Sequence, residues 1–370
     1  MNEFVVTPWE VKGEIDYQKL IKRFGTQLIT DQLAGRLERH GVDHWMLRRR
    51  IFYSHRDLVW LLNRYDQKEP FVLYTGRGPS ENTHLGHLMP WIFLRHLQDV
   101  FGTKVYFQLT DDEKYLFKPG LTMERARWFA HENALDFIAL GFDPTKTVIF
   151  SDLDYAKSLY NIAVRVAKKV TYSTTKAVFG FAESTNVGRI FFTCMQSAPA
   201  FLPSEEEGKN VPCLIPCAID QDAHWRITRD VAPLLGYYKP ATIYCKLLPS
   251  LAGPGKMSAS IPETSIFTTD KPAAARKKLE RGFTGGGVSI AEQKRLGGKP
   301  EVCSIYRYYQ FLFEPDDKKL NKIYEECRSG EMMCGECKKR LGARLEKFLT
   351  EHQRQRARAR ERLDDFLVMD

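Results

Sequence analysis

The sequence predicts an α/β fold in which a doubly wound parallel sheet is followed by an all-helical C-terminal domain. Between residues 71 and 250, short apolar strands alternate with helical stretches, as in parallel βαβ units. From Lys271 onward only helical periodicity remains. Polar clusters follow most of the predicted strands, and ligands of such sheets bind beyond the carboxyl ends of the strands. We therefore expect the functional site at that edge of the sheet.

The stretch 71–91, FVLYTGRGPSENTHLGHLMPW, is predicted as a strand, a glycine-rich turn and a helix. His84 and His87 stand where this helix begins, and a helix N-terminus gathers unpaired N–H groups and partial positive charge that attract phosphate. Gly86 leaves the backbone open to a ligand, and imidazoles can donate hydrogen bonds to phosphate oxygens. On its own, the stretch fits an ordinary turn with two surface histidines equally well.

A second segment, Gly-Lys-Met-Ser-Ala-Ser at residues 255–260, is a short polar loop with one lysine among small residues. Together, His-Leu-Gly-His and this loop resemble the His-x-Gly-His and Lys-Met-Ser-x-Ser signatures of class I aminoacyl-tRNA synthetases. The two lie in the family's order and roughly 170 residues apart, which suits a Rossmann-like, doubly wound nucleotide-binding fold. Leucine replaces the common isoleucine of the first signature, an apolar exchange that should keep its geometry.

Three further blocks make the resemblance more specific: QLTDDEKY (108–115), SDLDY (151–155) and CAIDQDAHWRITRDVA (217–232). With the two signatures, they look like the tryptophanyl-tRNA synthetases of the eukaryotic and archaeal type, over nearly the whole chain. The tyrosyl enzymes share the fold and both signatures, but the Asp-Gln-Asp block fits the tryptophan branch better. A coenzyme-forming nucleotidyltransferase can share the histidine turn, and a non-catalytic RNA-binding relative can share the fold; both are expected to lack part of this motif set.

The resemblance implies a cytoplasmic, homodimeric ligase that uses ATP with Mg²⁺ to form tryptophanyl-adenylate from L-tryptophan and then charges tRNA(Trp) for translation. The first step needs no strong base, because a carboxylate is already ionised near neutral pH; it needs alignment and positive charge around the phosphates. The catalytic groups are expected to be His84, His87, Lys114 and Lys256. The expected ATP site consists of Arg77, Gly78, His84, Gly86, His87, Lys114, Lys256, Met257, Ser258 and Ser260.

The amino-acid pocket must bury an indole ring and satisfy its single N–H group. By resemblance, Tyr74, Gln108 and Glu113 line this pocket, and Gln196 and Gln221 hold the amino and carboxylate ends of tryptophan. Read from the residues alone, Tyr74 could equally be core packing at a strand end, and Gln196 a helix-surface residue.

The chain's 370 residues exceed one typical domain, so we expect two. Residues 1–70 are predicted as a lead-in that packs on the catalytic domain. Residues 71–270 form that domain, with a helical insertion around 155–205. Residues 271–370 form the helical domain, which the resemblance identifies as anticodon-binding. An apolar content of 43% supports a sizeable core, no apolar run is long enough to span a membrane, and a net charge of +9 permits a polyanionic partner.

Two local patterns carry expectations of their own. Residues 54–57, Ser-His-Arg-Asp, resemble a capping box ahead of a helix. Residues 338–362 hold ten Lys or Arg and three Asp or Glu, including every second residue from Arg354 to Arg362. This row fits either a solvated helix face or a surface that contacts tRNA phosphates, and the sequence leaves both open.

Eight cysteines are spread along the chain, and buried free thiols are the simplest explanation for them. Cys334 and Cys337 form one C-x-x-C pair, while Cys303 and Cys327 stand apart from it in the sequence. A zinc site usually needs two such pairs, or one pair with suitably spaced histidines. We therefore expect no metal site in this protein.

Overall fold

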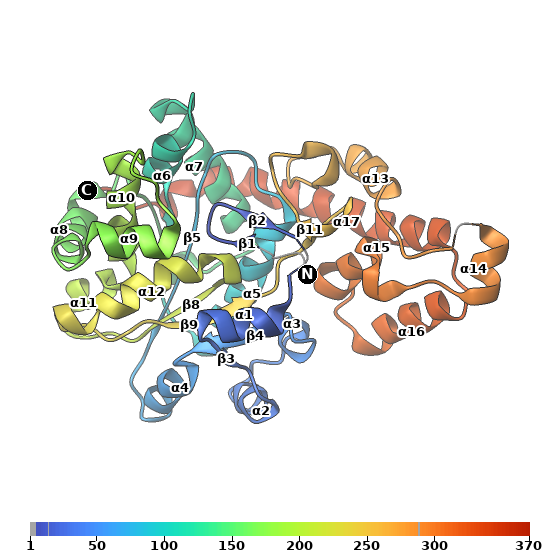
Figure 1. Ribbon diagram of the computed structural model, residues 1–370, viewed down its shortest axis with the longest axis horizontal. Helices are drawn as coiled ribbons and strands as arrows, with labels where there is room; N and C mark the ends of the chain where they lie inside the picture. Colours follow the sequence, from blue (N-terminus) through green and yellow to red (C-terminus); the bar gives the residue numbers. More distant parts are fainter. Residues whose placement is uncertain (1–4, 14, 288) are drawn as a thin grey trace.

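A seven-stranded sheet organises the computed structural model, which describes residues 5–13, 15–287 and 289–370 (Figure 1). From β9 to β7 neighbouring strands run parallel, and β3 and β4 add an antiparallel extension at one edge. The α/β class and the parallel core are therefore confirmed. Across the sheet the order is β3 (Gln27–Leu28), β4 (Phe52–Arg56), β9 (Ala241–Cys245), β8 (Cys213–Ala218), β5 (Val72–Arg77), β6 (Val105–Leu109) and β7 (Thr147–Ser151).

The order of the strands sets where a ligand can bind. The chain adds β6 and β7 on one side of β5, then crosses over to place β8 and β9 on its other side. The direction of winding therefore reverses between β5 and β8. A crevice opens at such a reversal, beyond the carboxyl ends of the strands.

Strand residues alternate between two apolar layers, as the period of two in a strand requires. Leu73 and Phe107 pack into one core, while Tyr74 and Tyr106 pack into the other. Helices α4 (Leu58–Asp66), α5 (Leu85–Phe101) and α7 (Met123–Ile138) contribute to the first core. Helices α1 (Tyr17–Phe24), α8 (Ala156–Ala167), α10 (Val187–Met195) and α12 (Asp222–Val231) contribute to the second.

Short elements connect and cover this framework. Two small hairpins are formed by β1 (Val5–Val6) with β2 (Val11–Lys12) and by β10 (Pro249–Ser250) with β11 (Gly253–Lys256). The remaining helices of residues 15–250 are α2 (Asp31–Arg39), α3 (Trp45–Arg48), α6 (Asp111–Phe117), α9 (Tyr172–Phe179) and α11 (Leu202–Glu207). Between β7 and β8, the described chain forms only helices and loops.

After residue 271 the described chain contains helices and no strand, as predicted. Part of this helical region lies at one end of the molecule (Figure 1), and its long last helix runs back from there across the sheet domain. Beyond α17 the backbone pairs with β7, because Ile149 N donates to Phe366 O at 2.8 Å. The helices are α13 (Pro272–Glu280), α14 (Ile290–Leu296), α15 (Ser304–Tyr308), α16 (Asp317–Arg328) and α17 (Cys334–Glu361), with a π-helical turn at Tyr309–Phe313.

The capping box predicted at residues 54–57 is wrong, although α4 does follow it. Ser54, His55 and Arg56 form the end of β4 and pair with β9 across the sheet. Asp57 has a left-handed φ of 51° and makes no side-chain cap; its carboxylate instead accepts from Arg229 Nη2 at 2.7 Å. Long-range strand pairing thus overrides the local pattern. No helix of the described residues combines the length and apolarity that a membrane crossing requires.

Candidate functional site

A cavity of about 610 Å³ lies at the carboxyl ends of the central strands. It brings together both signature segments, because His84, His87 and Lys256 all line it. Among the other residues predicted for the site, Tyr74 and Gln108 do not reach the cavity wall. The remaining predicted residues do line it: Arg77, Gly78, Gly86, Glu113, Lys114, Gln196, Gln221, Met257, Ser258 and Ser260.

The two histidines cap the N-terminus of α5 and support each other. His84 Nδ1 accepts from Gly86 N at 3.1 Å, and His87 Nδ1 accepts from His84 N at 3.1 Å. The rings stack with their centroids 3.6 Å apart. Since each Nδ1 is an acceptor, each neutral ring carries its proton on Nε2. A Cβ on Gly86 would lie 3.0 Å from His84 Cε1, so a glycine here lets the ring approach the backbone.

Burial keeps both imidazoles neutral. It lowers the pKa of His84 to about 3, with the charges of Arg77 and Lys256 acting in the same direction. It also lowers the pKa of His87 well below its ordinary value, together with repulsion from Arg77. The histidines therefore contribute two uncharged N–H donors at the cavity, and the cations around them contribute the positive charge.

Lys256 reaches the cavity from the end of β11. Its Nζ lies 3.1 Å from Asp220 Oδ2, directly after β8, while Asp220 Oδ1 is buried without a hydrogen-bond partner. Asp220 thus holds the ammonium beside the cavity by one oxygen. The rest of the loop is anchored, because Met257 is buried and its N donates to Leu248 O at 2.9 Å. Asp220 was not predicted as a site residue. The only feature of the sequence that could have indicated it is its position after a buried strand.

Two further cations also line the cavity. Arg77, at the end of β5, donates through Nε to Asn133 Oδ1 at 3.0 Å, and burial lowers its pKa to about 10. Lys114, in α6, lies 2.6 Å from Glu113 Oε1. A Cβ on Gly78 would lie 2.0 Å from Lys114 Cε, so a larger residue here would displace the end of this lysine. The predicted phosphate-binding cations thus surround one cavity.

Trp9, in the turn between β1 and β2, also lines the cavity. Its indole stacks on Phe117 with centroids 4.6 Å apart, and its Nε1–H donates to Glu113 Oε1 at 3.0 Å. Burial raises the pKa of Glu113, but Lys114 and hydrogen bonds from Thr110 and Trp9 lower it overall, so the carboxylate accepts this N–H in its ionised form. No local sequence pattern indicated Trp9, because its contact with Glu113 spans 104 residues.

A buried chain of polar groups lies beneath the cavity. Gln196, on its wall, donates through Nε2 to Tyr74 Oη at 2.9 Å and to Gln108 Oε1 at 3.0 Å. Tyr74 donates to Gln108, whose own Nε2 donates to Asp152 Oδ1 at 2.8 Å. Tyr74 also packs in the second core, so it serves both as a core residue and in this chain. The alternative of a surface position for Gln196 is wrong, since only 9% of it is exposed.

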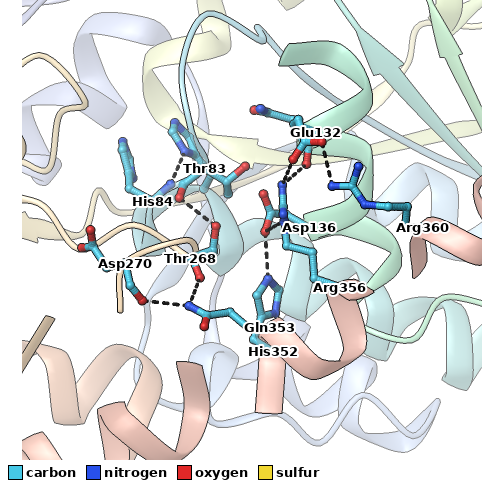
Figure 2. Close-up of polar contacts among 12 residues, drawn as sticks. Thr83, His84, Glu132, Asp136, Thr268, Asp270, His352, Gln353, Arg356 and Arg360 are labelled. Atoms are coloured by element: carbon cyan, nitrogen blue, oxygen red, sulfur yellow. Dashed lines mark hydrogen bonds and ion pairs between the residues drawn. The ribbon is translucent and has the colours of Figure 1, made fainter. Parts of the chain in front are cut away.

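Helix α17 contacts the segment that follows the second signature (Figure 2). Gln353 Nε2 donates to the carbonyl oxygens of Thr268 and Asp270, both at 2.8 Å. Thr268 in turn donates from its backbone N to Thr83 O at 2.9 Å, next to His84. Thr268 and Thr83 therefore connect a glutamine of the last helix to His84.

The arginines at every second position from Arg354 to Arg362 do not all have the same role. Arg356 Nε donates to the buried Asp136 Oδ1 at 3.1 Å, which also lies 3.0 Å from His352 Nε2 (Figure 2). Arg356 and Arg360 also pair with Glu132 of α7. Arg356 thus fits neither alternative of the sequence analysis, because it joins α17 to the sheet domain.

Comparison with known proteins agrees with this geometry. Residues 66–350 match the family model of class I tRNA synthetases (W and Y). The chain is 50% identical over 366 residues to a tryptophan–tRNA ligase of Pyrobaculum calidifontis, covering 99% of this chain and 98% of the relative. A ligase of the same name from Pyrococcus furiosus is 48% identical, with 99% and 94% covered.

Solved structures give the same picture. The tryptophanyl-tRNA synthetase of Plasmodium falciparum superposes with a TM-score of 0.87 at 39% identity, covering 93% of this chain and 94% of that one. The enzyme of Aeropyrum pernix superposes with a TM-score of 0.88 at 33% identity, with 96% and 97% covered. The chain therefore belongs to the class I tRNA synthetases of the tryptophan and tyrosine type, and its similarity to tryptophan–tRNA ligases extends over its whole length.

Proposed function

We propose that this protein uses ATP to activate L-tryptophan as tryptophanyl-adenylate and then transfers the tryptophanyl group to tRNA(Trp). The observation that carries the proposal is the convergence of His84, His87 and Lys256 on one cavity. The names of the relatives indicate the amino acid.

In the first step the tryptophan carboxylate attacks the α-phosphorus of ATP, and pyrophosphate leaves. The bond formed is carboxylate oxygen to α-phosphorus, and the bond broken joins that phosphorus to the bridging oxygen of the leaving group. His84 and His87 donate neutral N–H groups to phosphate oxygens, and Lys256 moves from Asp220 to the departing pyrophosphate. Such preorganised donors and cations stabilise charge that develops in the transition state. Arg77 and Lys114 hold the rest of the triphosphate.

The indole of tryptophan lies against the polar chain beneath the cavity. Glu113 lines the cavity and supplies an acceptor for its N–H. Tyr74 and Gln108 accept from Gln196 and hold it in place from behind the cavity wall, with Gln196 and Gln221 toward the amino and carboxylate groups. Glu113 already accepts an indole N–H from Trp9, which supports this role chemically. A buried site built to pair with an N–H rejects analogues that lack it, because its own polar groups are then left unpaired.

Several finer points belong to the same proposal. Mg²⁺ arrives with ATP and is held largely by the phosphates, as is usual for this ion. Residues 1–70 and 71–270 form the catalytic unit, and residues 271–370 receive the anticodon of tRNA. The protein acts in the cytoplasm as a homodimer, as the family resemblance implies.

Amino-acid-dependent ATP–pyrophosphate exchange tests the proposal, run separately with tryptophan, tyrosine and phenylalanine. Exchange with tryptophan alone, followed by charging of tRNA(Trp), is the expected result. Exchange with tyrosine instead, or with none of the three, would overturn it. Within the site, we expect Gln108→Ala to weaken tryptophan activation far more than ATP binding, and unchanged tryptophan kinetics would remove Gln108 from the pocket.

A further inference from the structure

Asp152 directly follows β7 and lies behind the wall of the cavity at the carboxyl ends of the central strands, without lining it. Only 1% of the residue is exposed. Both of its carboxyl oxygens accept from Gln108 Nε2, at 2.8 and 3.0 Å. A carboxyl group is costly to bury, and these two bonds connect it to the amino-acid end of the cavity.

The hydrogen bonds from Gln108 to Asp152 fix the orientation of the Gln108 amide. An amide donates through its nitrogen and accepts through its oxygen, so an acceptor at Asp152 keeps Nε2 on its own side. Oε1 then points the other way, where Tyr74 Oη and Gln196 Nε2 both donate to it. Without this acceptor the amide could turn over, because its two ends have nearly the same shape.

Gln196 takes its orientation from Gln108 in turn. Its Nε2 donates to Gln108 Oε1 at 3.0 Å and to Tyr74 Oη at 2.9 Å. Both amide protons are thus used inside the wall, and the carbonyl oxygen is the group that Gln196 offers to a ligand in the cavity that it lines. An ammonium group only donates hydrogen bonds, so it requires an acceptor of this kind. A reversed amide would present N–H groups to it instead.

A second carboxyl group supports Asp152 from the first turn of α6. The side chains of Asp112 and Asp152 are hydrogen-bonded to each other, which requires a proton between them. Burial raises the pKa of Asp112 to about 7 and raises that of Asp152 well above its ordinary value. The charges of Asp111 and Glu113 act on the pair in the same direction, and Tyr74 faces it from β5. Near neutral pH the pair therefore carries one proton and one negative charge.

We propose that Asp152 is a positioning residue for tryptophan, which acts through Gln108 to turn the carbonyl oxygen of Gln196 toward the substrate ammonium group. This inference rests on the proposed function, because it concerns the amino-acid end of the same cavity. The shared proton lets Asp152 remain a hydrogen-bond acceptor while it is buried against Asp112. Loss of that proton at higher pH leaves two facing carboxylates that repel each other, and the amides lose their fixed orientation.

Asp152→Leu removes the acceptor and keeps a side chain of similar size. In tryptophan-dependent pyrophosphate exchange, we expect KM for tryptophan to rise about tenfold to hundredfold, as for the loss of a hydrogen bond to a charged group, with KM for ATP unchanged. Asp154→Leu is the matched control, because its carboxylate pairs with Arg127 at 3.4 Å, and it should keep both parental constants. A parental KM for tryptophan in Asp152→Leu would overturn the inference.

A ligand without an amino group separates positioning from a general disturbance of the pocket. Indole-3-propionate has the indole ring and the carboxylate of tryptophan but no ammonium group. Its inhibition constant against tryptophan should be the same for the parent and Asp152→Leu, because it does not use the carbonyl oxygen of Gln196. An equal loss of affinity for tryptophan and indole-3-propionate would mean that Asp152 only supports the fold, and would overturn the inference.

Asp152→Asn tests the shared proton and keeps the shape of the side chain. Its Oδ1 can accept from Gln108 while its Nδ2 donates to the Asp112 carboxylate, so KM for tryptophan at neutral pH should stay near the parental value. Between about pH 6 and about pH 8.5, KM for tryptophan should rise in the parent and stay level in Asp152→Asn. A level profile in the parent, or the same rise in both proteins, would overturn the inference even if Asp152→Leu did not fold.

The parent chain separates this inference from the function on which it rests. If the parent shows no tryptophan-dependent exchange, the proposed function itself is wrong. If the parent exchanges with tryptophan while Asp152→Leu keeps the parental KM, only the positioning role of Asp152 is wrong.

Discussion

The two ends of this molecule build their sites in different ways. The cavity lined by His84, His87 and Lys256 draws many of its polar groups from two contiguous segments, the turn around His84 and the loop around Lys256. The helical end instead has a small cavity lined by Cys303, Cys327, Cys334 and Cys337, which come from the start of α15 and from α16 and α17. These four cysteines do not form one recognisable motif in the sequence. Catalytic chemistry is thus encoded locally here, and the architecture of the second domain is encoded by tertiary contacts.

The two regions also differ in what their charges do. Around the catalytic cavity, Lys256 and Lys114 each have one nearby carboxylate and remain directed at open space. Along α17, Arg356 is largely buried between Glu132 and Asp136. The two lysines are available to a ligand, whereas Arg356 is occupied by its ion pairs with α7. Variants of the two kinds should therefore affect different observables.

The largest effect is expected from Lys256→Ala. Loss of a cation that acts mainly on charge developing in the transition state typically lowers kcat by about 10²–10³. Pyrophosphate exchange at saturating ATP and tryptophan measures this directly, while thermal stability should stay nearly constant. Lys277→Ala, an exposed lysine of α13, is the control and should leave kcat unchanged. Equal rates for Lys256→Ala and the parent would remove the lysine from catalysis.

The next effect is on stability rather than rate. Arg356→Leu leaves Asp136, only 1% exposed, with His352 as its remaining partner, and Glu132 with Arg360. Removing one member of a buried ion-pair network costs about 3 kcal/mol. Denaturant unfolding should show this loss. Arg358→Leu, at an exposed position of the same helix, should stay within about 0.5 kcal/mol of the parent. If both variants unfolded alike, α17 would not be held by this contact.

This difference explains what the sequence could predict. Most strands and helices follow from local patterns of apolar runs and caps, and the cations that line the cavity follow from the family resemblance. The strands β3 and β4 were missed, because β3 is defined by pairing with β4, and β4 by pairing with β9. Trp9 and Asp220 were missed for the same reason: their partners Glu113 and Lys256 lie 104 and 36 residues away. The grouping of Cys303, Cys327, Cys334 and Cys337 could not be predicted, because these residues come together only where α15, α16 and α17 meet.

Measuring the free energy of unfolding at a series of pH values distinguishes buried imidazoles from exposed ones. In the unfolded chain His84 takes up a proton near its ordinary pKa of 6.5, whereas in the folded chain it does so only near 3. Acid therefore favours the unfolded state: the stability is fully present above about pH 6.5 and is lost as the pH falls toward 3. One such group contributes about 1.4 kcal/mol per pH unit, or about 2 kcal/mol between pH 6.5 and 5.

We expect His84→Asn to reduce the loss of unfolding free energy between pH 6.5 and 5 by about 2 kcal/mol. Asparagine can still cap the helix but does not titrate. Urea unfolding at pH values from 7 to 4 measures the slope. His131→Asn, at an exposed position in α7, is the control and should keep the parental slope. Parallel slopes for parent and His84→Asn would mean that His84 titrates alike in both states.

The smallest effect should come from Gln353, the residue through which the two regions meet. Its amide holds Thr268 and Asp270, and Thr268 holds the backbone at Thr83, beside His84 (Figure 2). Gln353→Leu keeps the size of the side chain but removes both hydrogen bonds, so the linking segment should loosen. Because it acts on position rather than on binding, we expect kcat for pyrophosphate exchange to fall about tenfold, equivalent to about 1.4 kcal/mol, with KM for tryptophan nearly constant. Gln355→Leu removes only a hydrogen bond to Glu351 on the same helix and should leave kcat unchanged. A Gln353→Leu variant with parental kcat would show that α17 covers the catalytic domain without positioning its histidines.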